Sequence, residues 1–426
     1  MDVLRSVLNA FFILIAYWWV YLPVLLAIGV FTLWKDYVQT KYLLSLKWVL
    51  LEIKPPPDVL RSPKIAENFF SGLHGVYARS LKTKKMLIEG KVPDWYSFEI
   101  VGTQGDVHFY IRTLEGNRNV VETHLFAQYP DAEIAVAEDY TQALPKQLPN
   151  EEYDLFGAEL VFTKSDAYPI KTYTFFEEER GKDEYVRTDP LAPLAEVLSS
   201  LGPGEHVWLQ YVARPTGDEW VKAAQAEVDK MVGKKPAPPK PNLLQKGLDA
   251  ISSVLPMVET PAAPEKKDEK EFSIQKLTSG QKFILDQIEN KVAKLAFKVT
   301  PRFVYVAKKD VFNRSRITNV IGMFKQLYSN NLNTFKPNSD TNTTPDGYLP
   351  WLFPSNSGFF KSQIEFERKV KMAKSYRWRG FSKTVILNTE EMATLFHLPG
   401  LNVKAPFFPR VDAKKSQPPA SLPIKE

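Results

Sequence analysis

The sequence predicts an α+β or α/β protein in which an N-terminal transmembrane helix precedes two or three ferredoxin-like split β-α-β units. Three observations lead to this prediction. Residues 6–34 contain no charged side chain, strand-like and helix-like stretches alternate from residue 47, and a segment rich in proline and lysine interrupts that alternation. The expected segments are a membrane anchor with its juxtamembrane stretch (1–46), a ferredoxin-like unit (47–150), a second α/β unit (151–232), a linker (233–272), a basic α/β unit (273–400) and a C-terminal tail (401–426).

The uncharged run near the N-terminus is long enough to cross a membrane as a helix. Its 29 residues exceed the ~20 apolar residues that span a hydrocarbon core about 30 Å thick. A cleaved signal peptide is the alternative, but its apolar core has only about 7 to 15 residues and ends at a small-residue cleavage site. Apolar residues continue here beyond Gly29 to Trp34, so we expect an uncleaved anchor.

Flanking charges predict the orientation of that anchor. Arg5 alone precedes the run, whereas Lys35, Lys41 and Lys47 follow it. Because basic residues favour the cytoplasmic side, we expect a single-pass protein of the cell membrane whose C-terminal body is cytoplasmic. The chain has no cysteine, which agrees with a cytoplasmic body, since disulfides are rare in that compartment.

The first unit follows the order β-α-β-β-α-β of a split unit. Residues 47–53 resemble a strand, which the three prolines at 55–57 end, and 65–76 carry apolar residues at helical spacing. Residues 95–101 and 107–114 alternate around the turn sequence GTQGD at 102–106, which favours a β-hairpin. A helix over 117–128 and a strand over 132–137 complete the pattern.

The same alternation continues beyond residue 150. In the second unit we expect strands at 158–162, 170–175 and 206–213, with helices from Pro190 and over 217–231. In the basic unit we expect helices at 274–296, 317–328, 363–376 and 390–396, and strands at 302–307 and 383–387, while the polar stretch 330–345 resembles a long loop.

The linker and the charge distribution each suggest more than one binding partner. Residues 244–255 form a short amphipathic stripe inside the linker, which could dock on a partner, on the bilayer or on its own chain. Residues 273–426 contain 25 Lys and Arg against 11 Asp and Glu, whereas the rest of the chain contains 30 against 38. A basic module of this kind is drawn to anionic headgroups, to nucleic acid or to an acidic protein; alternatively it balances the acidic half of its own chain.

The chemistry of known catalytic motifs is missing from the sequence. A phosphate loop needs G-x-x-x-x-G-K-[ST], and zinc hydrolases use H-E-x-x-H; neither occurs, and the five histidines are scattered. Two S-x-x-K matches, beginning at Ser273 and Ser279, lack the partner motifs of serine acyl-transfer enzymes. We therefore predict no enzyme, no catalytic or metal-binding residue and no cofactor.

The most unusual cluster is a run of basic and aromatic residues near the C-terminal end. Such side chains can contact phosphates or headgroups while aromatic rings stack or insert. In the alternative interpretation they form a helix whose basic side is exposed and whose aromatic residues enter the core. The candidate contact residues are Arg368, Lys369, Lys371, Lys374, Tyr376, Arg377, Trp378, Arg379 and Lys383.

Several short stretches resemble the N-terminal, membrane-attached module of conjugative-transfer (type IV secretion-like) ATPases of the HerA/coupling-protein class from small-genome, candidate-phyla bacteria. The likeness covers most of residues 48–424. The stretches are LLEIKP (50–55), LRSPK (60–64), FSGLHG (70–75), DPLAPL (189–194), LGPGE (201–205), WLQ (208–210), NTEEMATLFHLP (388–399) and KKSQPPASLP (414–423).

The resemblance implies a motor domain with a phosphate loop soon after the last of these stretches, and this sequence has none. We therefore expect a scaffold or docking subunit in a system for conjugation, DNA transfer or secretion. Its expected partners are the lipid bilayer and a separate HerA-like ATPase, with DNA and further copies of the chain as additional candidates. A nucleic-acid- or lipid-binding membrane protein unrelated to secretion is the alternative.

Overall fold

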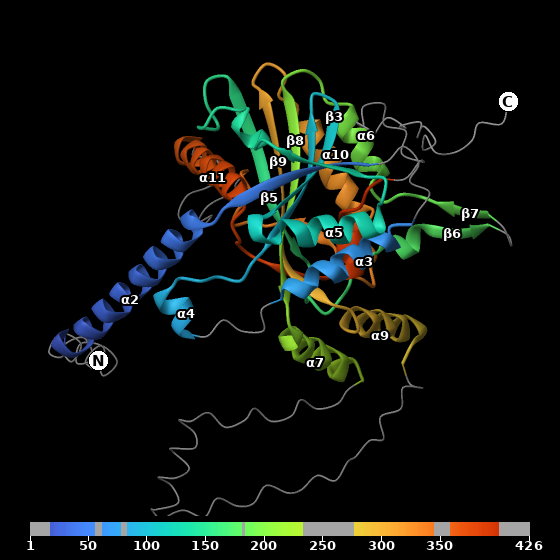
Figure 1. The fold of residues 1–426 in the computed structure, drawn as a ribbon, viewed down its shortest axis with the longest axis horizontal. Helices are drawn as coiled ribbons and strands as arrows, with labels where there is room; N and C mark the ends of the chain where they lie inside the picture. The colour runs from blue at the N-terminus through green and yellow to red at the C-terminus, as the bar shows by residue number, and fades with distance from the viewer. Residues whose placement is uncertain are drawn as a thin grey trace, which may run out of the picture.

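The computed structural model describes residues 18–55, 62–77, 83–180, 184–232, 277–344 and 358–399. These residues form an α+β fold around one antiparallel sheet of nine strands (Figure 1). The order is β10-β5-β9-β8-β2-β3-β1-β4, with β11 also beside β9. The strands are β1 (Trp48–Lys54), β2 (Tyr96–Thr103), β3 (Asp106–Leu114), β4 (Glu133–Ala137), β5 (Tyr153–Phe162), β8 (Glu205–Thr216), β9 (Ala296–Lys308), β10 (Phe335–Pro337) and β11 (Val385–Asn388), and a separate hairpin pairs β6 (Glu177–Arg180) with β7 (Glu184–Arg187).

The first predicted unit is confirmed. Strands β1, β2, β3 and β4 alternate with α3 (Lys64–Leu73) and α5 (Arg118–Gln128), and the spatial order β4-β1-β3-β2 is that of a split β-α-β unit. The β2–β3 turn closes at Gln104 and Gly105, whose φ angles of 53° and 100° are both positive. Hairpin turns of this type match the twist of the flanking strands, as the sequence GTQGD predicts.

The predicted second and third units share a single split unit. Its strand order β10-β5-β9-β8 takes β5 and β8 from one side of the linker and β9 and β10 from the other. Over its whole length, β8 pairs with β9, from Glu205 opposite Ala307 to Thr216 opposite Ala296. The linker, residues 233–272, is therefore an insertion between two adjacent strands, and all of it lies outside the described residues.

Two local predictions fail for identifiable reasons. Residues 170–175 were expected to form a strand, but the backbone N–H groups of Ile170 and Tyr173 donate to the side chains of Glu391 and Thr394 instead. Those bonds replace a strand ladder. The polar stretch 330–345, expected to be a loop, contains the short edge strand β10, which pairs with β5.

Five helices cover one face of the sheet and form the main core. Besides α3 and α5 they are α6 (Ala192–Ser199), α10 (Arg314–Lys325) and α12 (Thr389–Leu395). Aromatic rings concentrate where the two split units meet. The ring centre of Phe70 lies 5.0 Å from that of Phe98 and 6.1 Å from that of Phe297. The β2–β8 pairing, from Tyr96 opposite Ala213 to Thr103 opposite His206, joins the two units into a continuous sheet at this point.

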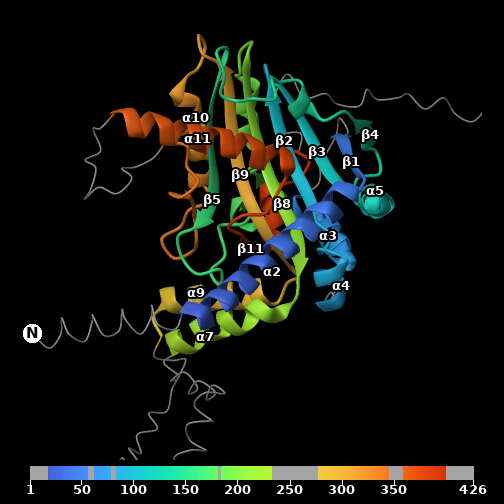
Figure 2. The same ribbon diagram turned by 90° about the vertical axis from the view of Figure 1, so that its left-hand side faces the viewer.

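The opposite face carries a second, smaller core beneath α11 (Gly358–Trp378) (Figure 2). Met372, Ala373 and Tyr376 of α11 are buried against this face. Gly157 of β5 permits the close approach, because a Cβ atom there would lie 2.5 Å from Cγ of Met372. A third cluster joins α7 (Val221–Val232) to α9 (Ser279–Val292) at the end of the sheet where β8 and β9 are connected.

The predicted N-terminal transmembrane helix, residues 6–34, is overturned. No helix in the described part of the chain is both long and apolar enough to cross a membrane. Helix α2 (Trp18–Ser45) projects from the body (Figure 1) and continues beyond Trp34 through Lys35, Asp36 and Lys41, so its second half carries charged side chains. That half lies against α4 (Thr83–Ile88), where the Trp34 indole donates to the Leu87 carbonyl at 3.3 Å. Residues 6–17 lie outside the described residues.

The pairing of β8 with β9 predicts how the chain responds to a cut in the linker. A protease should cleave first near residues 234–240 or 266–270, where proline and lysine are abundant. Because the two products share one ladder and one core, they should stay together during size-exclusion chromatography and separate only in denaturant. Two fragments that elute separately without denaturant would contradict the shared sheet.

Candidate functional site

The candidate contact residues lie on α11 and on the turn that follows it, but they do not share one surface. Tyr376 and Arg379 are buried with 1% and 0% exposure, whereas Trp378 is 63% exposed. Lys371 and Lys374 are exposed, as is Lys383 after the helix. The structure therefore separates the cluster into an inner set that fixes α11 to the sheet and an outer set that faces away from it.

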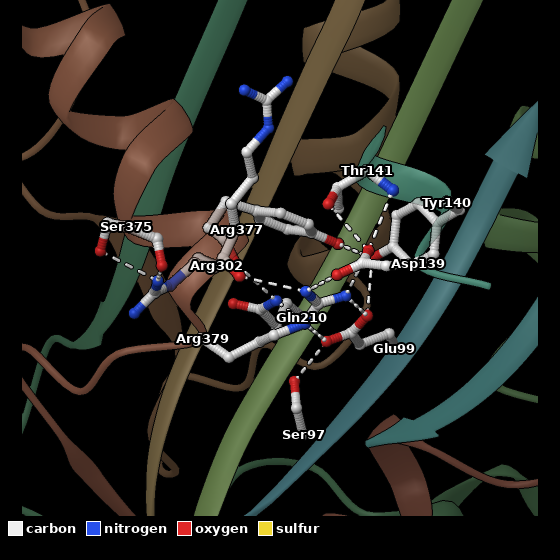
Figure 3. Close-up of polar contacts among 11 residues, drawn as sticks. Ser97, Glu99, Asp139, Tyr140, Thr141, Gln210, Arg302, Ser375, Arg377 and Arg379 are labelled. Carbon is white, nitrogen blue, oxygen red and sulfur yellow. Dashed lines mark hydrogen bonds and ion pairs between the residues drawn. The ribbon is translucent and has the colours of Figure 1, made fainter. Parts of the chain in front are cut away.

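Arg379 is the centre of the inner set (Figure 3). Its Nε and Nη2 donate to the two carboxylate oxygens of Glu99 at 2.8 and 3.1 Å. Its Nη1 and Nη2 donate to the two oxygens of Asp139 at 2.6 and 3.0 Å, and Nη1 also reaches the Arg377 carbonyl at 3.0 Å. All five donors of the guanidinium are thus used, which is the condition for burying an arginine at low cost.

The backbone of Arg379 adopts a strained conformation, and its side-chain hydrogen bonds must offset the energy of that strain. Its φ angle is 48°, in the left-handed region that costs a residue with a Cβ atom roughly 1 to 2 kcal/mol. This residue closes the C-terminal end of α11, where its N–H donates to the Tyr376 carbonyl at 3.1 Å. Glycine normally takes such a position; here Gly380 comes one residue later.

Glu99 receives bonds from both split units. Besides Arg379, its carboxylate accepts from Ser97 at 2.6 Å, from Gln210 of β8 at 3.0 Å and from the Tyr140 hydroxyl at 2.7 Å. Burial alone would raise the pKa of Glu99, but the charge and hydrogen bonds of Arg379 outweigh it and lower that pKa below its ordinary 4.5. Asp139 behaves alike: Arg379 overcomes the effect of burial and lowers its pKa below 3.8.

A second buried arginine, Arg302 of β9, holds the end of α11 from the other side of the network (Figure 3). It donates to the Ser375 carbonyl and hydroxyl at 2.6 and 3.0 Å and to the Gly380 carbonyl at 2.5 Å. Glu159 of the neighbouring strand lies 3.5 Å away as its counterion. The two arginines therefore anchor the same few residues, 375–380, to strands of both split units.

Three further basic residues of the predicted cluster are also used within the chain. Arg377 points away from Glu99 (Figure 3) and donates to the carbonyls of Pro145, at 2.6 Å, and Lys146. Arg368 donates to the Ser339 and Asn342 carbonyls at 3.0 and 2.9 Å. Lys369 lies 2.8 Å from both Asp154 and Glu365. These residues have intramolecular partners and hold loops against α11.

The remaining members form what we call the outer stripe: Lys371, Lys374, Trp378 and Lys383. The first three are spaced three and four residues apart, so they share one side of the helix. None of the four has a hydrogen bond, ion pair or ring contact with a described residue. The stripe is therefore a basic surface with one large exposed aromatic side chain.

A cleft of about 620 Å³ lies beside the other half of α11. Its walls come from the start of β5 and the segment before it, from the residue after β9 and from α11, and they include Glu151, Asp154, Lys309, Phe366 and Lys369. Lys369 joins Asp154 to Glu365 there, and despite burial those two carboxylates raise the pKa of Lys369 above its ordinary value. The lysine remains charged and paired, so it is not poised to act as a base.

The network beneath α11 offers no catalytic arrangement among the described residues. Tyr140 and Tyr376 have pKa values raised well above 10 by burial, with the charge of Glu99 adding to the effect, so both stay neutral donors. Catalysis by acid and base needs a group that can exchange a proton with a substrate, and here Glu99 and Asp139 are held ionised by Arg379. No group of three His, Cys, Asp or Glu in the described part of the chain could hold a metal ion.

Sequence reasoning missed the members of this network that lie outside the basic cluster: Glu99, Asp139, Gln210 and Arg302. Glu99, Gln210 and Arg302 each interrupt an otherwise apolar strand, and a polar side chain at an inward position of a strand signals a buried pair. That signal does not identify the partner. Asp139 and Arg379 lie 40 and 280 residues from Glu99 along the chain; Arg379 was singled out as part of the basic cluster, but nothing in the sequence connected it to Glu99.

Comparison with known proteins gives a family without an activity. The family model described as Domain of unknown function (DUF8128) matches residues 39–407, which is most of the chain, so the chain belongs to this family. No curated protein matches it. The matched region includes every strand of the sheet and the whole of α11.

The buried network predicts a large loss of stability on removal of one charge. Glu99→Gln should lower the free energy of unfolding by about 3 to 5 kcal/mol, because it leaves part of the Arg379 charge without a buried partner. Urea unfolding followed by circular dichroism measures this loss. Glu122→Gln is the matched control: it breaks the more exposed pair with Arg118 and should cost about 0.5 kcal/mol or less. Equal losses in the two variants would contradict a structural role for the network.

The lowered pKa values of Glu99 and Asp139 predict acid destabilisation. Above their ordinary values of 4.5 and 3.8 both carboxyls are ionised in the folded and unfolded states, so their contribution is complete. As the pH falls further, the unfolded chain binds protons before the folded one does, and stability is lost. Urea midpoints measured from pH 7 down to about pH 3 should fall less steeply in Glu99→Gln than in the wild type. A steeper fall in the variant would contradict this assignment.

Proposed function

We propose that this member of the DUF8128 family is a non-catalytic docking module that presents the outer stripe of α11 to an acidic partner protein. The observation that carries the proposal is Trp378, 63% exposed at the end of a helix whose opposite side is fixed by two buried arginines. Tryptophan is strongly enriched among the residues that dominate binding energy at protein interfaces.

Rigid presentation supports this role. Residues 375–380 are bound to β2, β8 and β9 through Glu99, Gln210 and Arg302, so the backbone next to Trp378 is already ordered before any partner arrives. A preorganised surface loses less conformational entropy on association than a flexible one. The unpaired lysines Lys371, Lys374 and Lys383 would then accelerate encounter with an acidic surface.

The resemblance to conjugative-transfer ATPases suggests the class of partner. A module similar to their N-terminal part would serve such a system by positioning its motor. We therefore propose a separate HerA-like ATPase as the docking partner. In this role the chain contributes position and orientation, and the partner contributes ATP hydrolysis.

Direct binding tests this proposal. The purified chain and the purified ATPase encoded with it should associate in biolayer interferometry, and Trp378→Ala should weaken the association by about 30-fold or more, the loss expected for a hot-spot residue. Lys371→Glu with Lys374→Glu should mainly slow association and make it less sensitive to salt.

Matched controls lie on other surfaces. Lys325→Glu with Lys336→Glu makes the same charge change at exposed positions of α10 and β10, and Phe126→Ala removes an aromatic side chain that is 42% exposed. These variants should bind as the wild type does. Wild-type affinity in Trp378→Ala, or ATP turnover by the isolated chain, would refute the docking role.

A further inference from the structure

Three basic residues that form no ion pair with a described residue lie on the α11 face of the sheet, at the end where α2 enters β1. Arg112 of β3 is opposite Ser97, which is opposite Val212 of β8, and Arg214 follows two residues later on β8. Lys298 of β9 is directly opposite Arg214. The three strands and the β2 strand between them span about 14 Å at the usual spacing of about 4.8 Å.

None of the three cations has a hydrogen bond or an ion pair with a described residue. The carboxylates that act on Arg112, those of Glu99 and Asp139, are both occupied by Arg379. Burial, together with the charge of Arg379, lowers the pKa of Arg112 to about 10, and burial alone lowers that of Arg214. All three are half-buried; Arg214 and Lys298 have no carboxylate partner among the described residues, whereas Arg112 is acted on by two carboxylates whose charge Arg379 neutralises only in part.

The opposition of Arg214 and Lys298 makes this arrangement costly. Like charges directly opposite each other on neighbouring strands, as Arg214 and Lys298 are, destabilise a sheet. A fold that keeps such a pair breaks a local rule of sheet stability, and sites that do so are expected to be functional.

Aromatic rings lie between and beneath the cations. The Arg112 guanidinium lies 4.2 Å from the Trp48 ring centre, and that of Arg214 lies 5.0 Å from the Phe381 ring centre. Trp95 lies between them, with its ring centre 4.7 Å from that of Trp48 and 5.9 Å from that of Phe381. Its buried indole N–H has no acceptor among the described residues. Trp48 and Phe381 remain partly exposed. The three rings thus form a connected group that reaches from Arg112 to Arg214.

We propose that this cation–aromatic row, formed by Arg112, Arg214 and Lys298 with Trp48, Trp95 and Phe381, binds single-stranded nucleic acid. Backbone phosphates supply the missing counterions, and unpaired bases stack on the exposed parts of the Trp48 and Phe381 rings. A duplex offers the phosphates but keeps its bases stacked on one another, so it uses only half of this surface. This row shares no residue with the outer stripe, although Phe381 is two residues from Lys383 in the sequence.

Fluorescence anisotropy with a labelled oligo(dT) of about 15 nucleotides, within the usual site sizes of single-strand-binding surfaces, tests the proposal. Arg214→Gln with Lys298→Gln should weaken binding by about 10-fold or more. It should also reduce the slope of log affinity against log salt by about 1.4, because each lost phosphate contact contributes about 0.7 for a single strand. An oligo(U) of the same length should bind comparably, since nothing in the row contacts a 2′-hydroxyl.

Two readouts separate this site from a folding defect and from the docking surface. Lys298→Gln removes the like-charge opposition, so its urea midpoint should be equal to or above that of the wild type while its binding falls. Lys325→Gln with Lys336→Gln removes two charges elsewhere and should leave binding unchanged, as should Trp378→Ala.

Four outcomes would overturn the proposal. They are failure of the wild-type chain to bind oligo(dT) at low salt, equal losses in the Lys325 and Lys336 control, equal affinity for a duplex of the same length, and full binding by the Arg214 and Lys298 variant. Loss of ATPase docking in Trp378→Ala with unchanged oligonucleotide binding would support both sites independently.

Discussion

The ion pair between Glu99 and Arg379 is the interaction on which the rest of the structure depends. Glu99 lies on β2 of the first split unit, and Gln210, which also binds it, lies on β8 of the second. Arg379 reaches this seam from the end of α11. Because a buried charge must be paired, the carboxylate on the sheet requires the arginine, and the arginine fixes both the helix end and the loop that carries Asp139.

This constraint determines what α11 can present. With Arg302 and Arg379 binding its last turn from beneath, the helix cannot roll about its axis without exposing two buried guanidinium groups. The side chains on the opposite side therefore keep fixed positions. A run of basic and aromatic residues that resembles one binding patch in the sequence is divided by the fold into residues bound within the chain and residues that contact no described partner, namely Lys371, Lys374, Trp378 and Lys383.

The same pairing leaves cations unmatched at the seam. Arg379 binds both Glu99 and Asp139, so Arg112 forms no ion pair with a described residue, and the sheet register places Arg214 opposite Lys298. Neither feature stabilises the fold. This face of the sheet carries few acidic residues. Arg379 is therefore paired, whereas Arg214 and Lys298 lie opposite each other without a carboxylate among the described residues.

The sequence by itself determined the local elements of the first split unit, because hydrophobic periodicity and turn chemistry act over a few residues: the hairpin at 102–106 and the order of β1 to β4 followed from them. It did not determine that β8 and β9 pair across the linker, because strands far apart in the sequence pair where their side chains share a core, and no local pattern specifies that partner. It could identify Glu99 as a buried polar residue but not its partner Arg379, 280 residues away. It predicted a transmembrane helix that the structure does not support, because α2 extends into a polar half packed on α4. Tertiary structure alone decided which basic residues of α11 have partners within the described chain. Lysines on the same helix differ only in which neighbouring groups they can reach, as Lys369 and Lys371 show.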